Sequence, residues 1–549
     1  TLIFSAWKMV PRMVATMVSY EVERKSVGKL QGKSKSRQPN YFEKKRYPFP
    51  LLTFKVKVED ASLQGMNNFM LSYPSIYLSD LYDCEKNIYA KQTLLEIRAE
   101  LKQKISKRLR ELNIFEIGEE GGDWQKWSWY SILLLDTNHS KYENLKNWLS
   151  GNIIDLVDVD SESEDTTEDK SGKKKHLDEI KRVIIDKEIP NVSKLNDDQF
   201  DKILEFAVDL CLGGSANAAL RSFSKVFKHK ENYLEQSYTV GGGFTSLFNK
   251  PESISIVQLM ISSGDYYQRV LTYSIDGNIQ SMMDEYFYLM KDSNSIGTSY
   301  ELAEAIANIL SIRPSLLEVG SISELKKTGN NKTKERTKNR LRSHFAMDFG
   351  QQKLTSGASR QVNLREAFNS PFRPFVLAST SIGQEGLDFH FYSKKIIHWN
   401  LPNNPIDFEQ REGRIHRFKG HVIRLNVAQK FKSHLSNDNN QLLWDQLFQI
   451  AEKIERPKAD FPCDLIPCWH VETSKGHSIE RIVPLYPFSK DIEKYQNMLK
   501  VLAYYRLTFG QPRQDELIEA MSEAGLNEND KSLLNDLMLN LTPLSYKNQ

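Results

Sequence analysis

Cysteine is scarce in this sequence. Its 549 residues include four cysteines, at positions 84, 211, 463 and 468. So few thiols in so long a chain argue against a secreted scaffold held together by disulfides. Cys463 and Cys468 lie close to His470, but no second ligand pair of similar spacing accompanies them, as a structural zinc site would require. We therefore predict no metal site, and expect buried or reactive thiols instead.

Long apolar runs and a dominant charge are also missing. No run approaches the ~20 apolar residues of a membrane-spanning helix, so we expect no membrane partner. The 74 Lys and Arg residues nearly balance 71 Asp and Glu residues, for a net charge of +3. Such a balance does not exclude nucleic acid, because binding depends on local clusters of charge. The expectation is a soluble protein of the cytoplasm.

Several apolar, β-branched runs are present, and they predict strands. They cover residues 2–5, 375–378, 395–400 and 422–427, and alternate with polar loops and short helices, which favours a parallel sheet. Much of the remaining chain has helical apolar spacing. We therefore predict an α/β fold, with a parallel-sheet lobe interrupted by a large, mainly helical insertion and followed by a helical C-terminal region.

Charge runs and composition set the predicted boundaries of these parts. Trp124, Trp127, Trp129 and Tyr130 form an aromatic cluster inside the insertion, which is either core or a base-stacking surface. The predicted parts are a first strand and helix at 1–25, an insertion at 26–335 with linkers at 26–50, 155–175 and 321–340, the remainder of the lobe at 336–430, and a helical extension at 431–549.

Two stretches have residue types suited to phosphate chemistry. Residues 378–389, Ala-Ser-Thr-Ser-Ile-Gly-Gln-Glu-Gly-Leu-Asp-Phe, follow a predicted strand. Gly383 and Gly386 allow close backbone approach to an anion, and Asp388 can accept hydrogen bonds from sugar hydroxyls. Residues 410–417, Gln-Arg-Glu-Gly-Arg-Ile-His-Arg, follow the next strand. A helix starting near residue 407 would place Arg414 and Arg417 on one face, where guanidinium groups suit a phosphate.

Each stretch also has a plainer interpretation. A glycine-rich loop after a strand is often a simple turn, and arginines on a helix usually form a solvated surface. The two stretches in this order are more specific than either alone.

Together they resemble motifs V and VI of superfamily 2 helicases, and residues 414–420 are similar to the Swi/Snf-type and RapA-like branch. Residues 2–7 resemble motif IV, the first strand of the same second RecA-like lobe. Residues 344–350, 362–369 and 505–514 resemble a subset of large bacterial helicases, some of which act in phage defence.

The resemblance implies a role for each matching residue. Arg414 and Arg417 would be arginine fingers reaching ATP held by the other lobe, and Gln410 and Arg411 would organise the interface between the lobes. Gly383, Gly386 and Asp388 would lie near the ribose and phosphates. Ser379 and Thr380 would lie close to the nucleic-acid backbone.

The phosphate-binding loop of the first lobe, G-x-x-x-x-G-K-[ST], is absent from this sequence. The glycines at 241–243 lack the Lys-Ser/Thr partner, and no acidic dyad follows an apolar strand at the required distance. ATP and Mg²⁺ are therefore expected to be held mainly by a separate first lobe, and this chain alone should be inactive towards ATP. The leading prediction is the C-terminal half of an ATP-driven motor on nucleic acid, with DNA favoured. The alternative is a non-catalytic nucleic-acid-binding or scaffold protein with a degenerate RecA-like lobe.

Overall fold

The chain divides into two compact units in a computed structural model. The sheet unit comprises Thr1–Ser19, Pro314–Leu435 and Asp445–Gln549, and the helical unit comprises Tyr20–Arg313 and Ser436–Trp444. The structure describes residues 1–31, 48–57, 62–113, 115–117, 123–151, 153, 166–188, 193–227, 232–293, 296–312, 315–319, 339–343, 345–349, 357–380, 387–436, 441–458, 464–471, 473, 475–507 and 513–524.

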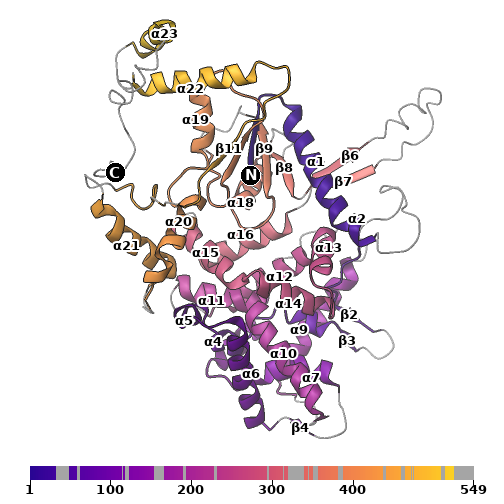
Figure 1. Ribbon diagram of the computed structural model, residues 1–549. Coiled ribbons are helices and arrows are strands. Elements are labelled where there is room, and N and C mark those ends of the chain that lie inside the picture. The colour runs from indigo at the N-terminus through magenta and orange to yellow at the C-terminus, as the bar shows by residue number, and fades with distance from the viewer. Residues whose placement is uncertain are drawn as a thin grey trace, which may run out of the picture. The chain divides into compact units, whose positions relative to one another are not determined.

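Five parallel strands form the core of the sheet unit, in the order β11-β10-β1-β9-β8. The chain's first strand, β1, lies in the middle of this sheet (Figure 1). Ser5 pairs with Thr380, and Phe4 pairs with His398, so the carboxyl ends of three strands meet at one edge. The strands are β1 (Leu2–Ser5), β8 (Ala346–Phe349), β9 (Val376–Thr380), β10 (Lys395–His398) and β11 (Glu480–Ile482). The predicted α/β fold class is confirmed.

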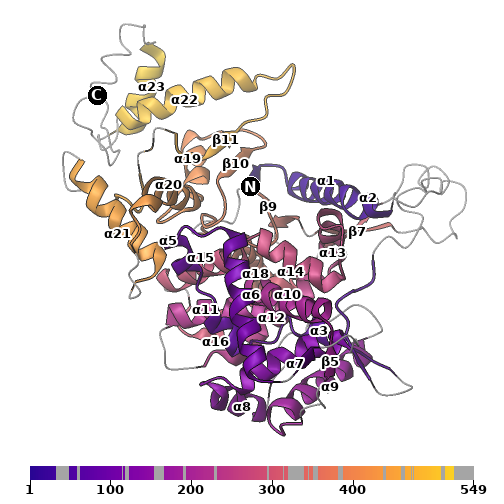
Figure 2. The ribbon, with the colours of Figure 1, turned by 60° about the horizontal axis from the view of Figure 1, so that its bottom comes forward.

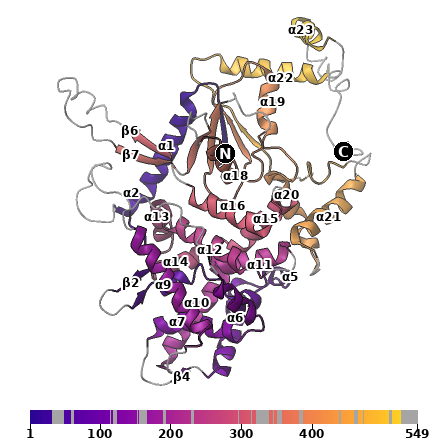
Figure 3. The ribbon, with the colours of Figure 1, turned by 180° about the vertical axis from the view of Figure 1, so that it is seen from behind.

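Helices cover this sheet and extend beyond it. Val14 of α1 packs with Ile3 and Ala378 of the sheet, and α22 runs across the end of α19 (Figures 1 and 3), where Met498 packs with Phe408. The unit's remaining strands, β6 (Ser315–Val319) and β7 (Asn339–Ser343), form an antiparallel hairpin. The helices are α1 (Met9–Lys25), α18 (Gly357–Phe368), α19 (Pro405–Gly413), α20 (His421–Phe431), η1 (Lys432–His434), α21 (Leu443–Glu455), η2 (Arg456–Lys458), α22 (Asp491–Leu507) and α23 (Gln514–Ala524).

The strand predicted at 422–427 is wrong, because this run lies inside the helix α20. Its buried apolar residues recur every fourth position, at Ile423, Val427 and Phe431, and that is a helical spacing. The strand that completes the sheet is β11, in a region predicted to be mostly helical. It has three residues, and Arg481 and Ile482 are exposed, so no buried apolar run announces it.

The helical unit is built from helices that pack on one another, with α6 towards the viewer in Figure 2. Two small pairs accompany them, β2 (Lys55–Val56) with β3 (Leu63–Gln64), and β4 (Phe115–Ile117) with β5 (Ser193–Leu195). The helices are α2 (Val27–Gln31), α3 (Met66–Phe69), α4 (Ile76–Leu81), α5 (Cys84–Tyr89), α6 (Leu94–Glu111), α7 (Trp124–Thr137), α8 (Tyr142–Ser150), α9 (Thr166–Ile184), α10 (Asp197–Gly213), α11 (Ser215–Phe227), α12 (Leu234–Phe248), α13 (Pro251–Met260), α14 (Tyr266–Asp276), α15 (Ile279–Asp292) and α16 (Ser299–Ser311).

Two features of the insertion that raised functional questions are structural. In α7, Trp127, Trp129 and Tyr130 are buried, so these aromatic residues belong to the core and cannot stack on bases. The glycines at 241–243 lie inside the buried helix α12. A Cβ on Gly241 would lie 2.8 Å from the Cα of Ser72, so this glycine permits close packing of the backbone.

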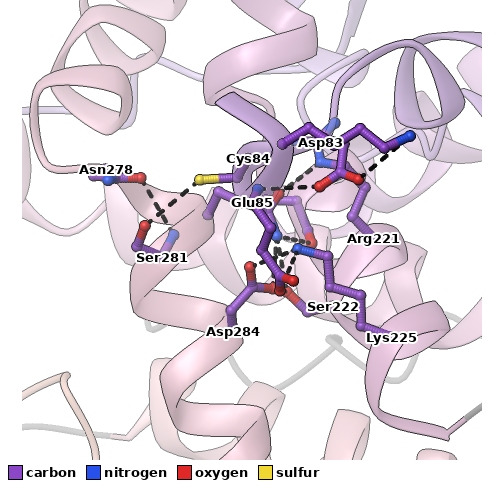
Figure 4. A network of polar contacts seen from close by, with 12 residues as sticks. Asp83, Cys84, Glu85, Arg221, Ser222, Lys225, Asn278, Ser281 and Asp284 are labelled. Carbon is purple, nitrogen blue, oxygen red and sulfur yellow. Dashed lines mark hydrogen bonds and ion pairs between the residues drawn. The ribbon is translucent and has the colours of Figure 1, made fainter. Parts of the chain in front are cut away.

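A buried polar network joins α5, α11 and α15 of the helical unit (Figure 4). The ammonium group of Lys225 lies 3.2 Å from a carboxylate oxygen of Glu85 and 3.1 Å from one of Asp284. The hydroxyl of Ser222 donates to Asp284 at 2.5 Å, and the guanidinium of Arg221 donates to Gln280 at 2.6 Å. These groups fix three helices against one another.

The predicted linker at 155–175 is wrong over residues 166–175, which begin α9. His176 in this helix is fully buried, with its ring nitrogens 2.8 Å from the carbonyl of Gly172 and 3.0 Å from that of Gln64. The packing of His176 and Ile180 outweighs the polar composition that suggested a linker. Most of the predicted linkers at 26–50 and 321–340 falls outside the described residues.

A search of the described residues for helices of membrane-spanning length and hydropathy finds no single helix. The bent pair α10 and α11 passes the same test by length and composition.

Candidate nucleotide and nucleic-acid site

The two stretches singled out in the sequence lie against each other. The backbone N–H of Phe389 donates to the carbonyl of Arg414 at 2.9 Å. The Arg414 guanidinium donates from Nη1 to the carbonyl of Leu387 at 3.2 Å, and Arg417 Nε donates to Asp388 Oδ1 at 2.9 Å. The segment that follows β9 and the segment that follows α19 therefore form one site.

The helix that was expected to present both arginines on one face ends before them. α19 stops at Gly413, and Arg414 is its C-cap. The N–H groups of Arg414 and Ile415 reach back only three residues, to the carbonyls of Arg411 and Glu412, which is a tightened helix end. Arg417 lies in the following turn, which Gly420 closes by donating its N–H to the Arg417 carbonyl. The turn, and not the predicted helix face, brings both side chains to the loop at 387–389.

The ion pair in this site is open to solvent. The Arg417 and Asp388 side chains are 42% and 44% exposed, respectively. An exposed pair of this kind contributes little to stability, because water screens the attraction and replaces the lost contact readily. Arg417 can therefore exchange Asp388 for an anionic ligand.

Asp388 is accessible but already has a protein partner. Its carboxylate accepts from Arg417, and its backbone carbonyl accepts from Asn369 Nδ2 at 2.8 Å, which fixes the loop. Gly383 and Gly386 lie outside the described residues, so their predicted contacts with phosphate stay predictions.

The two hydroxyl residues predicted near the nucleic-acid backbone differ in position. Ser379 is fully buried, and its hydroxyl donates to the carbonyl of Phe349 at 3.1 Å. Ser379 is therefore not placed to bind a phosphate, because successive strand residues point to opposite faces and this one points inward. Thr380 is half-buried at the end of β9, beside Ser5 of β1, and lies at the carboxyl edge of the sheet.

Gln410 and Arg411, both predicted at the interface between lobes, differ in their exposure to solvent. Gln410 is exposed on α19. Arg411 is 5% exposed, lies over the ring of Phe4 with 5.5 Å to its centroid, and donates to the carbonyl of Asn400 at 3.4 Å. Burial lowers the pKa of this guanidinium. Arg411 therefore anchors α19 on the sheet and does not lie at a surface.

Arg424 is a site residue that the sequence did not reveal. It is almost fully buried in α20, where Nη1 donates to the carbonyl of Lys419 at 2.8 Å and Nη2 to that of Phe391 at 2.5 Å. It thus connects the turn that holds Arg417 to the segment that holds Asp388. An arginine inside an otherwise apolar run was the available signal.

Two histidines behind this site are neutral at physiological pH. The N–H of His421 donates to the carbonyl of His390 at 2.9 Å. Burial lowers the pKa of each imidazole to about 4, and the positive charge of Arg424 acts in the same direction. Neither side chain adds positive charge to the arginine site.

Two arginines of this site carry charge that an anionic ligand could use. Arg414 and Arg417 present planar guanidinium groups that match phosphate oxygens. Within the part of the chain that the structure describes, no group of three His, Cys, Asp or Glu side chains could hold a metal ion.

Comparison with known proteins identifies the class of this region. Residues 331–419 match the family model described as a helicase conserved C-terminal domain. The matched range includes β8, β9, β10, α19 and both arginines. No curated protein and no solved structure matches the chain. Residues 331–419 of the sheet unit thus match a helicase C-terminal domain, and this match supports a helicase-type, nucleic-acid-related function.

Proposed function

We propose that this chain supplies the second lobe of an ATP-driven DNA helicase or translocase. Arg414 and Arg417 act as arginine fingers on ATP and Mg²⁺ held mainly by a separate first lobe. The observation that carries the proposal is the convergence of both arginines on the loop at 387–389. Guanidinium groups that keep their charge are suited to the charge that spreads over a γ-phosphate during transfer.

The other residues take supporting roles in this proposal. Asp388, released from Arg417, accepts hydrogen bonds from the ribose, and the glycines Gly383 and Gly386 approach the phosphates. Gln410, exposed on α19, contacts the first lobe. Thr380, at the carboxyl edge of the sheet, binds a phosphate of the DNA backbone. The motor works in the cytoplasm, in phage defence, as its resemblance to large bacterial helicases implies.

A non-catalytic scaffold with a degenerate lobe is the competing function. Among the described residues, the glycines at 241–243 lie inside the helix α12 and form no phosphate-binding loop. A scaffold would have no use for arginines that can reach a ligand, whereas Arg417 is half exposed and paired with a single exposed carboxylate. This accessibility favours the motor.

The test combines DNA binding and ATP hydrolysis by the whole chain. Fluorescence anisotropy with single- and double-stranded DNA at several salt concentrations should give an affinity that falls steeply as salt rises. ATP turnover should be absent with and without DNA. No DNA binding at low salt would favour a protein scaffold. DNA-stimulated turnover that Arg414→Ala abolishes would place a phosphate-binding loop within this chain.

A further inference from the structure

The end of α19 is held by a strand that follows it much later in the chain. Arg481 of β11 forms a two-pronged ion pair with Glu412, in which Nη2 lies 2.6 Å from Oε2 and Nε contacts Oε1. Glu412 lies in the last turn of α19, two residues before Arg414. The two partners are 69 residues apart in sequence.

Aromatic rings and a histidine surround this ion pair. The Arg481 guanidinium lies over the ring of Phe408, 4.6 Å from its centroid, and Phe408 is fully buried. The ring of His398 stacks on Phe408 at 4.1 Å, and its Nε2 lies 3.3 Å from Glu412 Oε1. Burial raises the pKa of Glu412, but its hydrogen bonds with His398 and Arg481 prevail, and the net pKa is lowered. The pair therefore stays charged at neutral pH and joins α19 to β10 and β11.

The far end of the turn at 414–420 is also held by later residues. The N–H of Lys419 donates to the carbonyl of Cys468 at 2.8 Å, and His416 Nε2 lies 3.2 Å from the carbonyl of Trp469. Both ends of the turn thus contact chain beyond residue 419, where the matched helicase domain ends.

We propose that Arg481 is a positioning residue for Arg414 and Arg417, and that it acts through Glu412. The inference rests on the proposed function of the two arginines. The last turn of α19 is tightened at Arg414 and Ile415, and the side-chain anchor at Glu412 helps to fix its direction. The direction of this last turn determines the position of Arg414, which is the residue directly after α19. Arg481 touches neither arginine and needs no contact with ATP.

Binding of inorganic triphosphate to the whole chain, followed by ³¹P NMR, tests this role. The loss of affinity in Arg414→Ala measures how much of the triphosphate binding depends on the Arg414 side chain. Because a small misplacement of a functional group is costly, we expect Arg481→Ala and Glu412→Gln to weaken triphosphate binding about tenfold. Glu480→Gln is the matched control. It removes the neighbouring ion pair between β10 and β11, in which Lys395 Nζ lies 2.8 Å from Glu480, and leaves α19 untouched. This variant should bind as the wild type does.

Hydrogen–deuterium exchange separates positioning from general loss of stability. Arg481→Ala should increase exchange in residues 414–420 and at the Phe389 amide, with the rest of the described sheet unchanged. Arg481→Lys, which keeps a positive charge opposite Glu412, should retain slower exchange and tighter binding than Arg481→Ala. Arg414-dependent binding that Arg481→Ala leaves intact would overturn the positioning role alone. Triphosphate binding that does not depend on Arg414 would instead contradict the proposed function. In that case, unchanged hydrogen exchange at residues 414–420 in Arg481→Ala would still reject the positioning role.

Discussion

Two ion pairs, one from each unit, show two different uses of charge. In the sheet unit, Arg417 and Asp388 pair at a surface, where each is more than 40% exposed. In the helical unit, the side chains of Lys225 and Asp284 pair at 22% and 20% exposure inside a network of helices. An exposed pair exchanges partners easily, whereas a half-buried pair fixes its neighbours, because removing one charge leaves the other poorly solvated. The Arg417–Asp388 pair thus keeps charge available for a ligand, and the Lys225–Asp284 pair uses charge to hold its helices together.

Arg414→Ala should have the largest effect and should affect function alone. When the chain is combined with a lobe that holds ATP, turnover should fall about 10³–10⁵-fold, which is the usual contribution of an arginine finger. The thermal unfolding midpoint should change little, because the hydrogen bond that the variant loses, from Arg414 to the Leu387 carbonyl, is partly exposed. Arg12→Ala, an exposed arginine of α1, is the control and should leave turnover intact. Wild-type turnover by the Arg414 variant would reject the finger role.

Lys225→Met should instead damage the fold. Removal of this ammonium leaves the half-buried carboxylates of Glu85 and Asp284 without their shared cation, at a cost of about 1–3 kcal/mol in the free energy of unfolding. Urea unfolding of the helical unit measures the loss. Lys104→Met breaks an exposed pair with Glu100 on α6 and should cost only about 0.3–0.5 kcal/mol. Equal losses of unfolding free energy in Lys225→Met and Lys104→Met would contradict the difference between half-buried and exposed pairs.

Gly241→Ala should destabilise the helical unit by a smaller amount. The added methyl group would lie 2.8 Å from the backbone of Ser72, and overpacking of this kind costs about 1–3 kcal/mol. Gly413 of the sheet unit is the matched position, since nothing lies within 4 Å of its added Cβ. Gly413→Ala should be neutral or stabilise by up to about 1 kcal/mol, through the helix propensity of alanine. Equal shifts of the urea unfolding midpoint in Gly241→Ala and Gly413→Ala would contradict this difference in packing.

The smallest effect concerns pH, and its sign should differ between the units. Half-buried His390 and His421 have pKa values lowered to about 4, so the unfolded chain binds protons first as the pH falls below about 6.5. The sheet unit should lose stability between pH 6.5 and 4. Burial raises the pKa of Asp136 to about 7, so the folded helical unit binds this proton first. That contribution stabilises the helical unit as the pH falls from 7 towards 4.

Calorimetry at pH 7 and 5 measures both trends. The midpoint of the sheet unit should move down relative to that of the helical unit, and His421→Asn should reduce the movement. If both unfolding midpoints of the wild type shift by the same amount between pH 7 and 5, then His390, His421 and Asp136 do not control the pH dependence of stability.

The sequence predicted the parts of the sheet whose strands are buried apolar runs. The strands β1, β9 and β10 lie where such runs occur. The run at 422–427 contains β-branched residues as well, but its helical packing around Ile423 and Val427 depends on tertiary contacts that local propensity does not encode. The edge strand β11 has too little buried surface to leave a pattern.

The candidate site was predictable in its residue types and not in its contacts. Arg414 and Arg417 were identified from a short motif, yet a helix face was expected where the structure has a turn. Ser379 and Thr380 are adjacent, and which of them points inward depends on the register of β9 in the sheet. The pairing of Glu412 with Arg481 spans too much sequence for a local pattern to reveal.

The central place of β1 has a consequence for how the protein is made. Its partners β9 and β10 are synthesised more than 370 residues later, because Leu2 pairs with Leu377 and Ile396. A ribosome therefore completes residues 20–313 of the helical unit before the sheet can close around β1. Contacts so distant in sequence form slowly, since a long loop must be closed first. During that interval the apolar strand Leu2–Ser5 is without its sheet partners, and a chaperone that shields this strand should increase the yield of folded protein.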